Sequence, residues 1–428
     1  MRRHLTTTSA LATLTLAAFA ATSAPAPAAA QELLFWSTQA RPVEEAQGMR
    51  EEVLSGFEGG AVDYQPQDAG PFITRLRAET EANEGTIAVV GALHGELTAF
   101  ADAFADLSAI DVSAASPALV ELGRLGTDEQ RYVPWMQATY LMAANRAALE
   151  HLPEGADVNA LTWDQLIEWG RAMEEATGSP KIGLPAGPQG LRHRVVQGYF
   201  YPSFTDSMVT RFRSDDAVAM WETVKELWEV TNPRSTSYNF MQEPLLADEV
   251  WVAIDHTARL AEAFNQRPDD FIAFPAPAGP TGRGFMPVVA GIAVPATAPD
   301  QEASLALVRY MLQPDTQIAT LRATNFFPVV DVELPEDMPP SVRAAGAAIA
   351  LQSGAPDANP GLLPVGLGDL GGQFNQVYVD TFERIVLAGQ PIEQVLDEGA
   401  QELRRIVDEA GAPCWAPDAA SEGPCPVE

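Results

Sequence analysis

The chain has 428 residues, 46% of them apolar and 20% charged, which is the composition of a globular protein long enough for two lobes or domains. Its formal net charge is −32, from 58 acidic and 26 basic residues. A chain this acidic repels nucleic acid and anionic lipid surfaces, so we expect neither as a partner.

The N-terminal 30 residues have the features of a secretory signal peptide. Arg2 and Arg3 give a basic start, residues 11–20 form an apolar stretch too short to span a bilayer, and APAPAAA ends in an A-x-A site. We therefore expect cleavage before Gln31 and a secreted, periplasmic protein. An uncleaved anchor is the alternative. No other apolar run approaches the ~20 residues that a membrane span needs.

Strand and helix patterns alternate along the first part of the mature chain. Residues 33–36 and 86–93 are apolar runs that predict strands, and residues 43–53 and 72–81 predict helices. This alternation is typical of α/β layering with a largely parallel sheet.

The later part of the chain contains the clearest helix signal, over residues 162–178. Thr162 and Gln165 form a capping box at its start, and Gly178 is suited to its end. A strand is predicted over residues 288–295. Further helices are predicted over residues 216–230, 300–313, 314–323 and 391–410.

Two cysteines, Cys414 and Cys425, lie in the Pro-rich segment APCWAPDAASEGPCPVE. In a secreted chain, two cysteines most simply form one disulfide, which would hold a tail that lacks the periodicity to fold alone. A metal site is the alternative, but no histidine lies nearby. We therefore predict a C-terminal tail, residues 411–428, stapled by a disulfide.

Five segments occur in an order that carries a family resemblance. They are VPWMQATYLMAANRAALE, LTWDQLIEWGRAM, FPAPAGPTGRGFMPVVAGIAVP, EASLALVRYMLQPDTQIATL and NFFPVV. Together they resemble the extracellular solute-binding proteins of ABC transporters, in the sugar-binding, maltose-binding-protein-like group (family 1). The resemblance covers essentially all of residues 31–410.

The resemblance implies an α/β, two-lobe periplasmic-binding-protein fold (type II-like) with a hinge between the lobes, which close on a ligand. Carried onto this chain, lobe one takes residues 31–137 and 288–325. Lobe two takes residues 138–287 and 326–410.

A sugar site needs paired hydrogen-bond donors and acceptors and flat aromatic surfaces, which loops at strand ends present to a cleft. In lobe one and at the first crossing, the candidates are Trp36, Thr38, Gln39, Arg41, His94, Glu96, Trp135, Gln137 and Thr139. For Gln39 and Arg41 the alternative is a solvated turn, and three others have a structural alternative. Trp36 would pack in the core, Trp135 would pack under the hinge, and His94 would cap a helix.

The remaining candidates are expected in lobe two and at the last crossing. They are Tyr199, Tyr201, Tyr238, Asp255, His256, Arg259 and Asn325. The tyrosines would serve as stacking surfaces, with core packing as the alternative. Asp255 and Arg259 follow an apolar strand and would bind hydroxyl groups, or else pair with each other. Many relatives have an aromatic residue in this loop, and this chain lacks it.

Catalytic and metal-binding patterns are weak in the sequence. Asp255 and His256 are neighbours, and neighbours on a strand point to opposite faces. There is no G-x-S-x-G or H-E-x-x-H motif, and the five histidines lack the spacing of metal ligands. The segment GLGDLGG fits G-x-G-x-x-G but follows no convincing strand. We therefore expect no enzymatic activity, no cofactor and no bound metal.

The resemblance implies a binding protein that captures a sugar or sugar derivative and delivers it to the membrane permease subunits of an ABC importer. We expect it to be a monomer. One alternative is an ionic solute, namely a phosphate ester or organic acid bound by Arg41, His94, Arg192 and Arg259, or a polyamine bound by carboxylates. A secreted glycoside hydrolase with two facing carboxylates is the other alternative.

Overall fold

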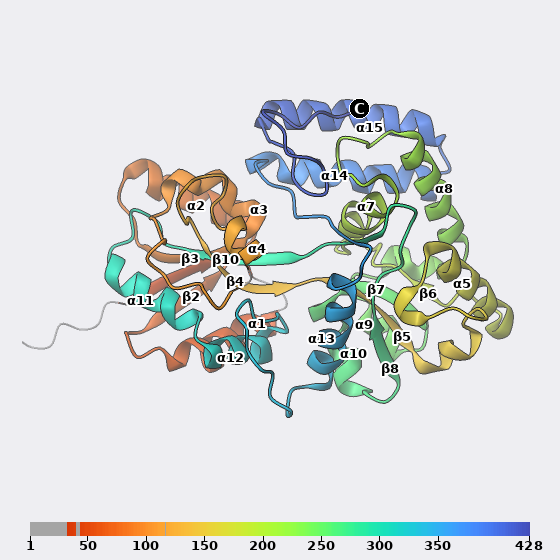
Figure 1. Ribbon diagram of the computed structural model, residues 1–428, viewed down its shortest axis with the longest axis horizontal. Coiled ribbons are helices and arrows are strands. Elements are labelled where there is room, and N and C mark those ends of the chain that lie inside the picture. Colours follow the sequence, from red (N-terminus) through yellow and green to blue (C-terminus); the bar gives the residue numbers. More distant parts are fainter. Residues whose placement is uncertain (1–31, 40–42, 116) are drawn as a thin grey trace, which may run out of the picture.

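The computed structural model describes residues 32–39, 43–115 and 117–428 and has two lobes, each built on its own sheet (Figure 1). The predicted signal peptide, Gln31 and Arg41 lie outside the described residues. Helices pack on the faces of both sheets. The predicted α/β fold with two lobes is therefore confirmed.

The first lobe contains a five-stranded sheet in the order β2-β1-β3-β10-β4. The strands are β1 (Leu33–Ser37), β2 (Val62–Pro66), β3 (Ile87–Leu93), β4 (Val133–Ala138) and β10 (Val288–Ala293). The central strand β3 is almost entirely buried, which explains its continuous apolar sequence. The helices of this lobe are α1 (Val43–Gly48), α2 (Ala69–Ala82), α3 (His94–Leu97), α4 (Pro117–Leu122), α11 (Gln301–Met311) and α12 (Pro314–Thr324).

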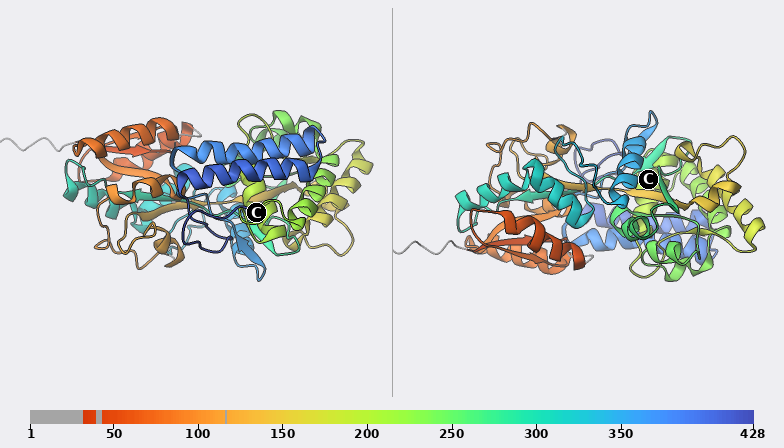
Figure 2. Two further views of the ribbon diagram at one scale, coloured as in Figure 1. Left: turned by 90° about the horizontal axis from the view of Figure 1, so that it is seen from above. Right: turned by 90° about the horizontal axis from the view of Figure 1, so that it is seen from below.

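The second lobe contains a four-stranded sheet in the order β6-β7-β5-β8 and a separate pair, β9 with β11. The strands are β5 (Tyr140–Asn145), β6 (Ile182–Gly183), β7 (Val252–His256), β8 (Phe271–Phe274), β9 (Arg283–Phe285) and β11 (Ala358–Pro360). Its helices are α5 (Trp163–Thr177), α6 (Arg192–Val195), α7 (Tyr201–Thr205), α8 (Asp215–Glu229), α9 (Gln242–Leu246), α10 (Thr257–Gln266), α13 (Pro340–Ser353), α14 (Gly371–Phe382) and α15 (Ile392–Ala410). Figure 2 shows α14 and α15 side by side over one face of this lobe.

Both sheets are mixed, because one strand in each runs against the others. The expectation of a largely parallel sheet is therefore met in the direction of most strands but not at the pairings of β10 and β5. In the first lobe, β1 pairs in parallel with β2 and β3, but β10 is antiparallel to both β3 and β4. In the second lobe, β5 is antiparallel to β7 and β8. The parallel pairs of the first lobe are local strand–helix–strand units. The antiparallel strand β10 enters its sheet after the chain has passed through the other lobe.

Three chain crossings join the lobes. The chain changes sheet between β4 and β5 and again between β9 and β10, and it crosses a third time after α12. The crossings are bonded to one another, because Gln137 and Phe327 exchange two backbone hydrogen bonds (3.0 and 2.6 Å) and Thr139 Oγ1 donates to Met286 O (2.9 Å). The lobe boundaries that we propose, at 137/138, 287/288 and 325/326, lie at or next to these crossings, the first of them one residue before the end of β4.

Helix α5 shows how closely local signals specify this fold. The Thr162 side chain accepts a hydrogen bond from the Gln165 N–H, and the Gln165 side chain accepts one from the Thr162 N–H. Gly178 has a φ of 74° at the C-cap, a left-handed conformation that favours glycine. Both predicted ends of this helix are confirmed.

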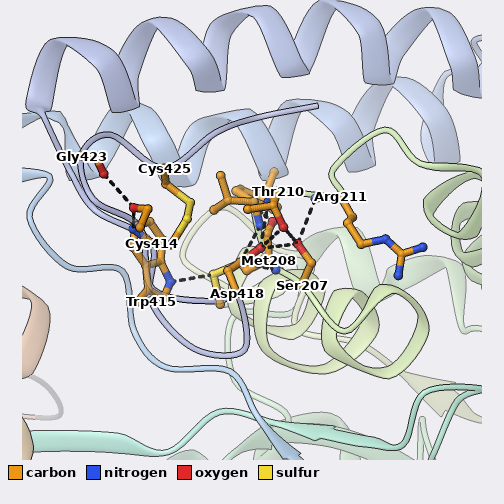
Figure 3. Close-up of a disulfide and its surroundings, with 12 residues drawn as sticks. Ser207, Met208, Thr210, Arg211, Cys414, Trp415, Asp418, Gly423 and Cys425 are labelled. Atoms are coloured by element: carbon orange, nitrogen blue, oxygen red, sulfur yellow. Dashed lines mark hydrogen bonds between the residues drawn. A yellow bond between two sulfur atoms is a disulfide. The ribbon is translucent and has the colours of Figure 1, made fainter.

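The C-terminal tail is held by the predicted disulfide between Cys414 and Cys425 (Figure 3). The two sulfurs are buried together with Trp415, whose ring packs edge-on against Phe374 of α14 (5.5 Å between ring centroids). Asp418 lies within the disulfide loop and points at residues 207–210 of the second lobe. The tail is therefore an integral part of that lobe.

Candidate functional site

A cavity of about 580 Å³ lies between the two lobes and takes its walls from both. The first lobe contributes the beginning of α2 and the turn from β3 into α3. The second lobe contributes Arg194 of α6 and the segment 363–375, which includes the start of α14. Its size is within the range of cavities that enclose a small molecule.

The lobes touch at the edge of this cavity. Arg77 of α2 makes a two-pronged ion pair with Asp369 of the second lobe, with N–O distances of 3.0 and 3.3 Å. Gly95 of α3 faces the backbone of Pro364 so closely that a Cβ at position 95 would lie 2.0 Å from the Pro364 carbonyl oxygen. Closure at this edge therefore depends on the absence of a side chain at position 95.

Glu96 is the acidic group of the cavity wall. Its Oε2 accepts hydrogen bonds from the Thr38 hydroxyl (2.7 Å) and the Leu93 N–H (3.0 Å). Burial raises the pKa of Glu96, whereas these bonds and the charge of Arg194 lower it. Of the residues predicted from sequence, Thr38 and Glu96 are thus brought together, with Gln39 bonded to Thr38 (3.4 Å).

Two arginines of the second lobe face glutamates of the first. Arg194 lines the cavity together with Glu96, and the charge of each influences the pKa of the other. Arg259 does not line the cavity, but its charge acts on the buried Glu45 of α1. Burial and Glu44 raise the pKa of Glu45 well above its usual range, and Arg259 lowers it. The cavity wall therefore combines a carboxylate of the first lobe with a guanidinium of the second.

Arg259 begins α10, next to the end of β7. Its Nη1 donates to the carbonyls of Gln189 (3.2 Å) and Asn239 (3.1 Å), and the guanidinium lies 4.5 Å from the Phe240 ring centroid. His256 is the last residue of β7, pairs with Tyr140 of β5 and contacts its ring edge-on (5.3 Å). The strand ends of the second lobe therefore place Tyr140, His256 and Arg259 in one neighbourhood.

Asp255 takes neither of the two roles that the sequence suggested. The carboxyl group is completely buried and accepts hydrogen bonds from the N–H groups of Met241 (3.0 Å) and His256 (2.8 Å). Burial raises the pKa of Asp255 to about 6, with Arg259 lowering it. Among the described residues, no ion pair joins it to Arg259 or to any other base. Its role in this structure is to hold the loop before α9.

The predicted aromatic surfaces are packed inside the lobes, where they have no face free for a ligand. The Trp36 ring contacts Arg75 and donates to Phe72 O, and Trp135 has no exposed surface. The hydroxyls of Tyr199 and Tyr201 bond main-chain carbonyls within the second lobe. Tyr238 bonds Glu249.

Three predicted residues serve the crossings. Gln137 Nε2 donates to Pro328 O (2.8 Å), and Thr139 bonds the second crossing. Asn325 ends α12 with a φ of 55° and accepts a bond from Ser341 (3.2 Å). These contacts stabilise the hinge region and lie apart from the lining of the cavity.

Sequence reasoning missed Arg77, Tyr140, Arg194, Asp369 and Asn375, and it did not consider Glu45. The one available signal was the basic cluster LRHRVV, residues 191–196, which is unusual in so acidic a chain. Only Arg192 of this cluster was named, and it pairs with Glu383 outside the cavity lining.

His94 is buried at the start of α3, with Nδ1 2.9 Å from the Tyr132 hydroxyl. Burial lowers its pKa to about 4.

The low pKa of His94 predicts a loss of stability in acid. Between pH 6.5 and 4 the unfolded chain binds a proton at this residue and the folded chain does not, so the free energy of unfolding falls by up to ~3 kcal/mol. His94→Gln cannot take up that proton. We expect its unfolding free energy, measured in urea at a series of pH values, to fall less steeply than that of the wild type. An equal slope in both proteins would contradict the assignment.

Within residues 32–39, 43–115 and 117–428, no group of three or more His, Cys, Asp or Glu side chains has the arrangement of a metal site. Over the same residues, no helix is both long and apolar enough to cross a membrane.

The sequence of this chain matches a known protein family. The family model described as bacterial extracellular solute-binding protein matches residues 41–318. No curated protein sequence matches the chain.

Several solved structures share the fold. The GacH receptor of Streptomyces glaucescens, solved unliganded and with acarbose, is 17% identical, with 88% of this chain and 98% of that chain covered and a TM-score of 0.68. The sugar-binding protein MalE of Xanthomonas citri is 16% identical, with 88% and 97% covered and a TM-score of 0.70. UgpB of Mycobacterium tuberculosis, solved with glycerophosphocholine, is 18% identical, with 89% and 99% covered and a TM-score of 0.69.

Proposed function

Because the chain belongs to the bacterial extracellular solute-binding protein family, we propose that it captures a sugar or sugar derivative between its lobes and delivers it to the permease subunits of an ABC importer. The solute binds in the cavity of about 580 Å³ and leaves unchanged. The protein acts outside the cytoplasm as a monomer, after removal of residues 1–30.

The observation that carries the proposal is the two-sided cavity. One wall holds Glu96 and the other holds Arg194, so a polyhydroxylated solute finds acceptors on one lobe and donors on the other. Closing the lobes around the solute buries both of its faces. Acarbose and glycerophosphocholine, which two structures of the same fold contain, are both small, polar and rich in oxygen.

Thermal unfolding of the mature chain tests this function. We expect a sugar or sugar derivative to stabilise the protein, by ~2.7 kcal/mol at about 100 times its dissociation constant. The panel should contain mono- and oligosaccharides, polyols, sugar acids and sugar phosphates. In Glu96→Gln, which keeps the size of the side chain, the affinity should fall about tenfold because a charged acceptor is lost.

Glu84→Ala, an exposed change in the same lobe, is the matched control and should bind as the wild type does. Absence of stabilisation by every member of the panel would contradict the proposal. Release of reducing sugar from an oligosaccharide would instead favour a hydrolase.

A further inference from the structure

Arg194 and Arg259 are half-buried and, among the residues that the structure describes, have no acidic partner at ion-pair distance. Acidic residues outnumber basic ones by 58 to 26, and arginines such as Arg77 and Arg213 form ion pairs with carboxylates. In the described part of the chain, no carboxylate lies within ion-pair distance of Arg194 or Arg259. Arg194 Nη1 donates to the neutral Gln197 Oε1 (3.1 Å), and Arg259 donates to two main-chain carbonyls.

Tyr140 has an unused donor and packs against the segments that carry both arginines, because its ring contacts Tyr199 after α6 and His256 before α10. Its side chain is 3% exposed, and its ring is fixed by Tyr199 and His256. Its main-chain N–H and carbonyl are both bonded by Tyr199, but its hydroxyl has no hydrogen-bond partner among the described residues. Burial raises the pKa of Tyr140 to about 12, and Arg194 and Arg259 lower it, so the phenol keeps its proton.

Arg194 lines the interlobe cavity, and Tyr140 and Arg259 lie on segments next to it. Tyr140 is the first residue of β5 after the crossing, and Arg259 donates to Gln189 in the loop that leads to α6 and Arg194. His193 precedes Arg194 in α6, and burial together with the nearby arginine charges lowers its pKa well below the usual range.

We propose that the transported solute carries an oxyanion, a carboxylate or a phosphate, that binds Arg194 and Arg259 and accepts a hydrogen bond from the Tyr140 hydroxyl. The proposal rests on the proposed function and narrows it to acidic sugar derivatives. A guanidinium binds both oxyanions through paired N–H donors, and the Tyr140 hydroxyl is a further donor without a partner in the described part of the protein. An oxyanion offers acceptors to both guanidinium groups and to this hydroxyl.

Calorimetric titration of the mature protein tests the proposal with matched probes. These are glucose, glucuronate and glucose 6-phosphate, a maltose and maltobionate pair, and inorganic phosphate at constant ionic strength. We expect at least one oxyanion probe to bind at least about tenfold more tightly than its neutral counterpart. Preference for the acids or for the phosphates identifies which oxyanion the site accepts.

The variants locate the binding. Arg194→Gln and Arg259→Gln should each weaken the oxyanion probe at least about tenfold, and Tyr140→Phe, which removes only the hydroxyl, about fivefold. Arg146→Gln is the matched control, because Arg146 is exposed, bonds a main-chain carbonyl and lies away from the cleft. Unfolding temperatures without ligand establish that each variant is folded.

The outcomes separate the two proposals. Two results would show that Arg194 and Arg259 do not bind an oxyanion of the solute. One is that neutral sugars bind as tightly as the oxyanions, and the other is that the variants do not affect oxyanion affinity. The oxyanion proposal then falls and the proposed function stands. If none of these probes and no member of the sugar panel binds, both fall.

Discussion

Replacing Asp418 with alanine lowers the free energy of unfolding by about 2–6 kcal/mol, because it leaves two buried backbone donors without a partner at about 1–3 kcal/mol each, together with one part-buried donor. The carboxylate, only 6% exposed, accepts from the N–H groups of Met208 (2.7 Å), Val209 (3.0 Å) and Thr210 (2.9 Å). It also accepts from the hydroxyls of Ser207 and Thr210 (Figure 3). Urea unfolding followed by tryptophan fluorescence under non-reducing conditions measures the loss.

Asp418→Asn refines this prediction. The asparagine keeps the shape of the side chain but turns an NH₂ group toward N–H donors, so it should recover only part of the lost stability. Glu422→Ala is the matched control, since Glu422 is exposed on the same tail and inside the same disulfide loop. A loss in Asp418→Ala as small as that in the control would show that the tail does not stabilise the lobe through this carboxylate.

Asp418 also shows where prediction from sequence ends. Signals contained in a few neighbouring residues were sufficient for the capping box of α5 and for pairing the only two cysteines. The contact between Asp418 and residues 207–210 joins positions about 200 apart in the chain. No sequence feature near Asp418 or near residues 207–210 predicts this contact. In a sequence, an aspartate that accepts buried N–H groups cannot be distinguished from an aspartate in solvent.

The candidate site was predictable in place but only partly in detail. Strand ends facing the cleft were the correct region to search, and there the structure brings Thr38 to Glu96 and His256 to Tyr140. Which side chain points to the cleft depends on strand register. Asp255 points into its own lobe, whereas its neighbour His256 packs against Tyr140. The sequence alone does not show which of the two side chains points in which direction.

Aromatic residues were the least predictable group. The sequence suggests Trp36, Trp135, Tyr199 and Tyr201 as stacking surfaces in loops or at strand ends, but all are buried in the lobes, and both tyrosines lie in helical segments. A large side chain gains about 2–3 kcal/mol from burial in either setting, so its sequence position does not separate a ligand platform from a core.

Gly95→Ala is expected to weaken solute affinity at least about tenfold by holding the lobes apart. The added methyl group would lie 2.0 Å from the Pro364 carbonyl oxygen and 3.2 Å from its carbonyl carbon. Backbone atoms cannot rotate away as a side chain can, so the contact is relieved only by separating α3 from the second lobe. Alanine itself favours helix α3 by roughly 1 kcal/mol, so the variant should remain folded.

Two measurements distinguish blocked closure from a smaller cavity. The radius of gyration from small-angle X-ray scattering should decrease with saturating ligand in the wild type and decrease less in Gly95→Ala. Gly372→Ala is the matched control, because Gly372 lines the same cavity and a Cβ there meets no atom within 4 Å. If both variants bind alike, the loss follows from cavity volume. If Gly95→Ala binds and contracts as the wild type does, the contact with Pro364 does not limit closure.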